Sequence, residues 1–234
     1  EMGIRAYGFH GTSHKYVTEK ALEYLHKPNA KIITVHLGNG CSMAAVKGGR
    51  SVDTTMGFGP LNGLVMGTRS GDIDPSIIFY LVNQLGYSLD QVNHLLNKQS
   101  GMQGLTGFSD MRDIIKAKTA GNEQADLAYE MYAYRIKKYI GSYAAVLNGL
   151  DAIVFTAGVG ENDSALRRMV CTEMDFLGIH LDEEKNEQRS GKFREISKVN
   201  SSVKILVIPT NEELEIVKQC FALLQEELAS VEPV

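Results

Sequence analysis

Three short apolar runs, each followed by glycine or polar residues, constrain the fold of this chain more than any other feature. The runs are Ile32 to Val35, Ala152 to Phe155 and Val203 to Ile208. Their length is that of buried strands, and segments with helical periodicity separate them, so the sequence predicts an α/β fold. In open α/β sheets, ligands bind beyond the carboxyl ends of the strands. We therefore expect the segments that follow these runs to face one cleft.

Capping residues and apolar spacing predict the helices between these strands. The longest helix runs from about Glu123 to Leu147 and would span roughly 37 Å at 1.5 Å per residue. Ser88 and Gln91 form a capping box for another helix. A further helix is predicted from Thr12 or Ser13, as N-cap, to Leu25, and another between Asp74-Pro75 and Gly86. A β-hairpin is predicted from Cys41 to Thr54. The terminal helix is predicted to be amphipathic, with Thr210 as N-cap and Glu213 at N3.

Composition favours a globular protein that binds a small soluble ligand. The 234 residues are 44% hydrophobic, and the formal net charge of -4 arises from interspersed residues of both signs. No basic stripe argues for nucleic acid, and no polybasic or long apolar run argues for a membrane. Cys41, Cys171 and Cys220 include no C-x-x-C pair, which speaks against a disulfide framework or a zinc site and fits the cytoplasm.

The block from His36 to Pro75 combines glycine turns, small hydroxyl residues and one arginine beyond the hairpin, which suits phosphate binding. Glycine lets the backbone approach a phosphate, and consecutive N–H groups in tight turns bind anions. Gly38-Asn39-Gly40 follows a predicted strand directly, so it is the first candidate. Arg69 lies among glycine and hydroxyl residues, where a guanidinium can bind phosphate or carboxylate bidentately. A hairpin turn without a ligand and a solvated surface arginine are the structural alternatives.

A second glycine motif, Gly158 to Asn162, follows the predicted strand that ends at Phe155. We expect it to be a loop, with a helix restarting near Ser164. The motif could be part of the dinucleotide fingerprint G-x-G-x-x-G. Position 163 is Asp where the third glycine belongs, so a Rossmann site is excluded.

Six segments together resemble the ordered motif set of the acetate kinases. They are Tyr7 to His14, His36 to Gly40, Met66 to Asp72, Ser109 to Arg112, Gly158 to Asn162 and Pro209 to Glu213. They occur in the family's order and cover nearly the whole chain. The resemblance implies the actin, Hsp70 and sugar-kinase type of fold, a ribonuclease H-like lobe with a mixed sheet and flanking helices. It also implies Mg²⁺-dependent, reversible phosphoryl transfer between ATP and acetate, giving ADP and acetyl phosphate, by a cytoplasmic homodimer.

Acetate kinases have two similar α/β lobes around a nucleotide cleft, and this chain resembles only the C-terminal lobe. The resemblance implies that the N-terminal lobe supplies a glycine- and serine-rich phosphate loop, a substrate-binding arginine and an aspartate near the metal. We therefore expect residues 1–234 to form one nucleotide-binding lobe. Such a lobe carries about half of the active site and is expected to be inactive alone.

The resemblance also implies roles for individual residues. His10 and Arg69 would stabilise charge on the transferring phosphoryl group, and Glu212 would hold Mg²⁺ mainly through water. Phe9 and Pro60 would line the pocket for the acetate methyl group. The nucleotide site would comprise His36, Gly38, Asn39, Gly40, Asp110, Met111, Arg112, Gly158, Val159, Gly160, Glu161 and Asn162.

Several alternatives remain open at this point. His10 could be a capping or core histidine, and Arg112 could pair with Asp110 at a helix start. A metal site made by His10 and His14 is rejected, because His10 precedes the helix and the two rings would not share a helix face. Two other functions are a propionate or other short-chain acyl kinase, and a nucleotide-binding module without catalysis.

Overall fold

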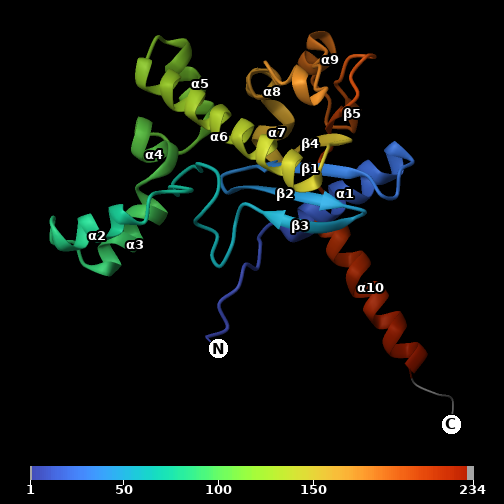
Figure 1. The fold of residues 1–234 in the computed structure, drawn as a ribbon, viewed down its shortest axis with the longest axis horizontal. Helices are drawn as coiled ribbons and strands as arrows, with labels where there is room; N and C mark the ends of the chain where they lie inside the picture. The colour runs from blue at the N-terminus through green and yellow to red at the C-terminus, as the bar shows by residue number, and fades with distance from the viewer. Residues whose placement is uncertain (1, 231–234) are drawn as a thin grey trace.

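The computed structural model describes residues 2–230 and contains one six-stranded sheet in the order β3-β2-β1-β4-β6-β5 (Figure 1). The central strands β1, β4 and β6 are parallel, while β2, β3 and β5 run antiparallel to their neighbours. The strands are β1 (Lys31–Leu37), β2 (Cys41–Lys47), β3 (Arg50–Thr54), β4 (Ala152–Thr156), β5 (Arg194–Glu195) and β6 (Lys204–Val207). The predicted core strands and hairpin are confirmed, and the short β5 is the strand that the sequence did not predict.

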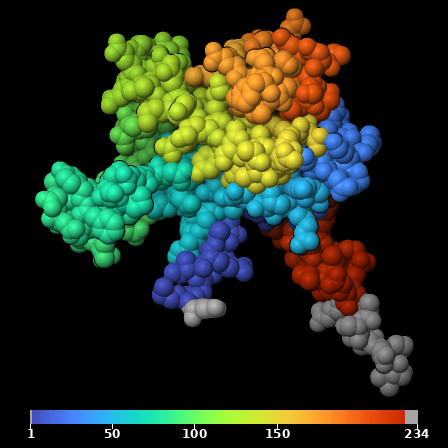
Figure 2. All heavy atoms as spheres, in the orientation of Figure 1, coloured from blue at the N-terminus to red at the C-terminus, as the bar shows by residue number. Residues whose placement is uncertain are grey.

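Helices cover the sheet, and two helical elements extend from the body of the molecule (Figure 2). The helices are α1 (Gly11–Leu25), α2 (Ser76–Asn83), α3 (Leu89–Lys98), α4 (Gly101–Thr106), α5 (Met111–Thr119), α6 (Glu123–Leu147), α7 (Ala157–Asn162), α8 (Ser164–Cys171), the 3₁₀ helix η1 (Asp175–Leu177), α9 (Glu183–Glu187) and α10 (Glu212–Ser230). The helices α2 and α3 extend from the left of the body in Figure 1, and α10 extends from its lower right.

The central strands of the sheet are buried on both faces, and alternate side chains of β1 point into different helical layers, whereas the edge strand β3 is largely exposed. Ile33 and Val35 belong to a core that includes residues of α6 and α8. Ile32 belongs to a second core, which includes Val17 and Ala21 of α1. The result is a mixed sheet between helical layers, which confirms the predicted α/β fold class.

Local capping chemistry explains several helix ends. α6 has the predicted bounds, and Ser88 caps α3 through the predicted capping box with Gln91. α2 begins directly after Asp74-Pro75, and Gly86 follows its end with a left-handed φ of 72°. The bounds of α6 and the start of α3 are therefore confirmed, whereas α2 begins one residue later than predicted, with Pro75 as N-cap, and its C-cap is Gln84, so Gly86 lies one position beyond the C′ position predicted for it.

Other predicted ends are wrong. α1 has His10 as its N-cap, with a left-handed φ of 57°, instead of Thr12 or Ser13. Residues 158–162 form no loop, because they lie in α7, which follows β4 directly. At α10, Asn211 Oδ1 accepts a hydrogen bond from Leu214 N at 2.9 Å. The capping box of Thr210 and Glu213 is therefore replaced by an Asn211 cap.

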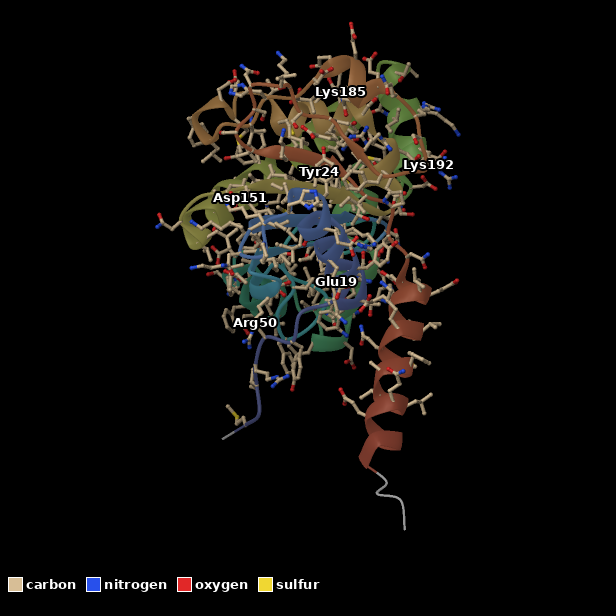
Figure 3. All side chains as sticks on the ribbon, turned by 90° about the vertical axis from the view of Figure 1, so that its right-hand side faces the viewer. Glu19, Tyr24, Arg50, Asp151, Lys185 and Lys192 are labelled. Atoms are coloured by element: carbon tan, nitrogen blue, oxygen red, sulfur yellow. The ribbon has the colours of Figure 1, made fainter. Side chains whose placement is uncertain are left out.

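α10 does not bury the apolar face expected of an amphipathic helix. Its Glu215 side chain is 1% exposed and pairs with Lys15 of α1 at 2.6 Å. The exposed large apolar side chains of α10 are Leu214, Ile216, Val217, Phe221, Leu223 and Leu224. Figure 3 shows α10 standing away from the body along most of its length. Despite these apolar residues, no helix in the described part of the chain is long and apolar enough to cross a membrane.

Candidate active site

The turn between β1 and β2 is fixed by contacts of its backbone. Gly38 N donates to Gly40 O at 3.1 Å, and the Cys41 thiol donates to Gly38 O at 3.3 Å. Gly67 N donates to Asn39 O at 3.1 Å, which ties the turn to the segment before α4. A Cβ at Gly67 would lie 2.2 Å from Asn39 Oδ1, so a side chain there would displace the Asn39 amide. The Asn39 amide is therefore positioned by the close approach of a glycine.

His10 lies before α1 with its ring against β2. Its Nδ1 lies 2.9 Å from Ser42 Oγ, and its ring stacks on that of His36 with centroids 4.2 Å apart and planes inclined by 13°. Burial, and secondly the neighbouring Arg69 guanidinium, lower the pKa of His10 below its ordinary value. The imidazole is therefore mainly neutral at neutral pH.

The Arg69 guanidinium forms no ion pair with a carboxylate of the described residues. Its Nη1 donates to Pro60 O at 2.9 Å and lies 3.7 Å from Met66 Sδ. Gly40 lies beside both predicted catalytic side chains: a Cβ there would be 3.3 Å from His10 Nε2 and 3.5 Å from Arg69 Nη1. His10 and Arg69 thus meet around one glycine, and Arg69 retains donors for an anion.

A buried histidine, His14, lies behind His10, and no sequence pattern indicated its contacts. His14 Nε2 lies 2.7 Å from Ser42 Oγ, and His14 Nδ1 lies 2.7 Å from Thr34 Oγ1. His10 and His14 therefore converge on the Ser42 hydroxyl, although their rings do not share a helix face. Burial, with smaller effects of the neighbouring histidines, lowers the pKa of His14 to about 3. Among residues 2–230, no group of three or more potential ligand side chains is arranged to hold a metal ion.

His36 has its own hydroxyl partners. Its Nδ1 lies 2.8 Å from Ser13 Oγ, which accepts a hydrogen bond from Thr210 Oγ1 at 2.9 Å. Burial, and secondly the ring of His10, lower the pKa of His36 to about 4. The structure thus gives Ser13 a hydrogen-bonding role between α1, β1 and the segment before α10.

A cavity of about 820 Å³ opens beside the β1–β2 turn. Predicted nucleotide-site residues that line it are Gly38, Asn39, Asp110, Met111, Arg112, Gly158, Val159 and Asn162. Other lining residues, not predicted individually, are Gly67, Met102, Ser109, Ile115, Tyr132, Asp163, Ser164, Ala165 and Arg189. The cavity is large enough for a small-molecule ligand of nucleotide size and combines apolar walls with a few polar groups, as such sites do.

The other predicted nucleotide-site residues lie off this lining. Gly160 is buried where α7 packs on the sheet, and a Cβ there would be in ordinary van der Waals contact with Val35 O at 3.6 Å. Glu161 Oε1 accepts a hydrogen bond from Thr210 N at 3.3 Å. Gly40 lies between His10 and Arg69, and His36 lies beneath His10, as described above.

Asp110 and Arg112 form the ion pair predicted for a helix start and also line the cavity predicted to hold a nucleotide. Asp110 caps α5 by accepting from Arg112 N at 2.8 Å, and its Oδ2 lies 2.6 Å from Arg112 Nη2. Hydrogen bonds from the Arg112 side chain and then its backbone lower the pKa of Asp110 to about 2. The helix-start ion pair therefore exists, and both residues also line the cavity.

A buried arginine supports the α7 wall of the cavity. The Arg167 guanidinium donates to Gly160 O at 2.8 Å, and to Asn186 Oδ1 and Asn186 O at 2.9 Å each. Burial lowers the pKa of Arg167 to about 10, so the group remains charged at neutral pH. Nothing in the sequence pattern identifies this residue, because its acceptors lie on other elements.

The predicted metal ligand Glu212 and the predicted substrate-pocket residues Phe9 and Pro60 are more exposed than the buried histidines. Glu212 is exposed at the first turn of α10, and no described residue hydrogen-bonds to its carboxylate. A single free carboxylate suits Mg²⁺, which keeps several waters and takes other ligands from substrate phosphates. Phe9 is half-buried against the main core, whereas Pro60 is exposed and joined to Arg69 through its carbonyl.

Comparison with known proteins identifies relatives of this architecture. An acetate kinase of Flavobacterium johnsoniae is 64% identical over 96% of this chain and 57% of its own length. The crystal structure of Porphyromonas gingivalis acetate kinase matches with a TM-score of 0.92 at 48% identity, covering 95% of this chain and 56% of that one. A propionate kinase from Francisella tularensis matches with a TM-score of 0.86 at 47% identity, covering 91% and 54%.

The chain spans about half the length of the curated relatives it matches. Within that half, the sequence alignment covers 96% of this chain and the structural alignment covers 95%. The sequence model of the acetokinase family matches residues 1–218. This chain belongs to the acetokinase family.

Proposed function

We propose that residues 1–234 form the C-terminal, nucleotide-binding lobe of an enzyme that transfers a phosphoryl group reversibly between ATP and acetate. The convergence of His10 and Arg69 around Gly40, close to the glycine turn that edges a nucleotide-sized cavity, carries this proposal. The names of the acetate kinase relatives support the same reaction.

The chemistry of the site fits direct transfer to a carboxylate. A carboxylate is a nucleophile at neutral pH and needs no general base, so the protein must align the reactants and stabilise charge on the moving group. Arg69 supplies a fixed cation, and His10 adds a hydrogen-bonding nitrogen beside it. Glu212 would hold Mg²⁺, which when bound neutralises charge on the nucleotide phosphates.

Nucleotide binding is proposed along the cavity. Asn39 and the glycine turn would bind phosphates, while the Asp110–Arg112 pair and α7 would lie along the adenosine. A second candidate substrate is propionate, because a propionate kinase shares this fold at 47% identity. Phe9 and Pro60 are proposed to line the pocket where the two acids differ by one methylene.

Trapping of the acyl phosphate by hydroxylamine tests the proposal. The complete enzyme should form hydroxamate from ATP and acetate, with a lower kcat/KM for propionate. The chain of 234 residues should bind ADP but form at least about 100-fold less hydroxamate, because catalytic donors are missing. Turnover by this chain equal to that of the complete enzyme would contradict the two-lobe site, and absence of turnover by the complete enzyme would favour a binding module.

A further inference from the structure

We propose that Thr34, His14 and Ser42 form a directional chain of hydrogen bonds that holds His10 as a neutral imidazole with its proton on Nε2. The chain makes His14 and Ser42 positioning residues for His10. The role of this chain in phosphoryl transfer rests on the proposed function, whereas the position of the His10 proton does not.

The direction of the chain is set at Thr34. Its buried hydroxyl has two acceptors within reach, His14 Nδ1 at 2.7 Å and Ala44 O at 3.5 Å. An O–H···O bond is normally roughly 2.5–3.0 Å long, so the carbonyl is a poor acceptor here. If Thr34 accepted from His14, its own proton would be left almost unbonded in the core, which is unfavourable. The Thr34 proton therefore points to His14 Nδ1.

The remaining protons follow from the donor inventory of each group. A neutral imidazole carries one N–H, so His14, accepting at Nδ1, carries its proton on Nε2. That N–H donates to Ser42 Oγ at 2.7 Å. The single Ser42 proton is then directed to His10 Nδ1 at 2.9 Å. His10 accepts at Nδ1 and must carry its own proton on Nε2.

This nitrogen is the one that lies beside Arg69. A Cβ at Gly40 would lie 3.3 Å from His10 Nε2 and 3.5 Å from Arg69 Nη1, so both donors lie beside the same glycine. Burial and Arg69 both lower the pKa of His10, and no described carboxylate forms an ion pair with its ring. A neutral ring held in this tautomer can donate to a phosphoryl oxygen without a second positive charge beside Arg69.

His36 has a parallel arrangement with the same outcome. Thr210 donates to Ser13 Oγ at 2.9 Å, so the Ser13 proton is free to donate to His36 Nδ1 at 2.8 Å. His36 is then also protonated on Nε2, the nitrogen that would lie 3.7 Å from a Cβ at Gly38. Two stacked imidazoles thus have their Nδ1 atoms facing hydroxyl groups and their Nε2 atoms facing the glycine turn.

Nitrogen-15 NMR of the histidine side chains in this chain at about pH 7 tests the proposal, because the shifts of Nδ1 and Nε2 distinguish the two tautomers. His10→Gln assigns the His10 signals. The wild-type chain should show His10 protonated on Nε2. Ser42→Ala, and separately Thr34→Val, should populate the Nδ1-protonated form, while Ser42→Thr, which keeps a hydroxyl, should retain the wild-type signature. If Ser42→Ala fails to fold, Thr34→Val at the far end of the chain gives the same readout.

A wild-type His10 protonated on Nδ1, or an unchanged His10 tautomer in the folded Ser42→Ala and Thr34→Val variants, would overturn the proposal. Neither result depends on turnover, so failure of the chain and failure of the proposed kinase activity are distinguishable. In the complete enzyme, Ser42→Ala should lower kcat at least about tenfold with nucleotide affinity unchanged, and Ser42→Thr should restore most of it. A loss of nucleotide affinity without a loss of kcat would contradict the positioning role.

Discussion

His14 and His36 lie beneath the site with 7% and 8% of their surface exposed, and both are held as neutral rings. The pKa of each is lowered in the folded chain, to about 3 and about 4, from an ordinary value of 6.5. Between these values the unfolded chain binds more protons than the folded one, so the free energy of unfolding decreases as pH falls from about 6.5 toward 4.

Urea titrations at about pH 7, 5.5 and 4.5 measure this decrease. His14→Gln removes one buried titrating group and should make the loss of stability with falling pH smaller. His94→Gln changes an exposed histidine of α3 and serves as the control, which should follow the wild type. The same pH dependence in all three proteins would show that the neutral His14 does not control acid stability.

Arg69 should be sensitive to a change that conserves its charge. Arg69→Lys replaces a planar fork with a point charge, so alignment of phosphoryl or carboxylate oxygens is lost in the complete enzyme. We expect kcat/KM for acetate to fall well below a third of wild type while nucleotide affinity is nearly unchanged. The control is Arg50→Lys, at the exposed start of β3. Retention of more than about a third of kcat/KM, a loss under roughly 0.7 kcal/mol, would contradict the role of Arg69.

At the scale of elements, an ion pair between Lys15 and the buried carboxylate of Glu215 joins α10 to α1. Lys15 reaches Glu215 Oε1 at 2.6 Å, while Glu215 Oε2 has no hydrogen-bond partner in the described structure. Lys15→Met would leave that carboxylate buried without its cation. Because Lys15 is itself 49% exposed, we expect a destabilisation of about 1–2 kcal/mol instead of the larger cost of a fully buried pair.

The matched control for this pair lies on the same helix. Lys20 pairs with Glu23 at the surface, so Lys20→Met should change the free energy of unfolding by less than about 0.5 kcal/mol. Thermal unfolding of both variants provides the measurement. Equal effects of the two substitutions would mean that the burial of Glu215 adds nothing to the Lys15 ion pair.

The bounds of α6 and the start of α3 depend on nearby residues and were predictable, whereas the conformation of α7 depends on distant packing and was not. The bounds of α6 and the capping box of α3 follow from periodicity and from side chains three positions apart. α7 has a glycine-rich sequence typical of a loop, yet packing of Gly160 on the sheet and the Arg167 hydrogen bond favour a helix. The contact of His14 with Ser42 spans 28 positions, and no local pattern encodes it.

For the whole molecule, we predict a homodimer in which α6 contributes to the interface. Leu127, Met131 and Tyr134 are spaced along one side of α6 and are 58%, 38% and 63% exposed. Sedimentation of the complete protein at tens of micromolar should show a dimer that Tyr134→Glu weakens. Val52→Glu, at an exposed apolar site on β3, is the control and should leave the dimer intact. A folded wild-type protein that sediments only as a monomer would contradict the prediction.

The glycines that border the cavity meet two different steric constraints. At Gly67 a Cβ would lie 2.2 Å from Asn39 Oδ1 and 3.0 Å from Ser109 O, so a larger residue there would displace the Asn39 amide whether or not a ligand is bound. Gly158 lines the same cavity, yet nothing lies within 4 Å of a Cβ added to it, so the fold of the chain alone leaves room for alanine there. The fold alone therefore accounts for glycine at position 67, whereas glycine at position 158 leaves open space at the cavity wall.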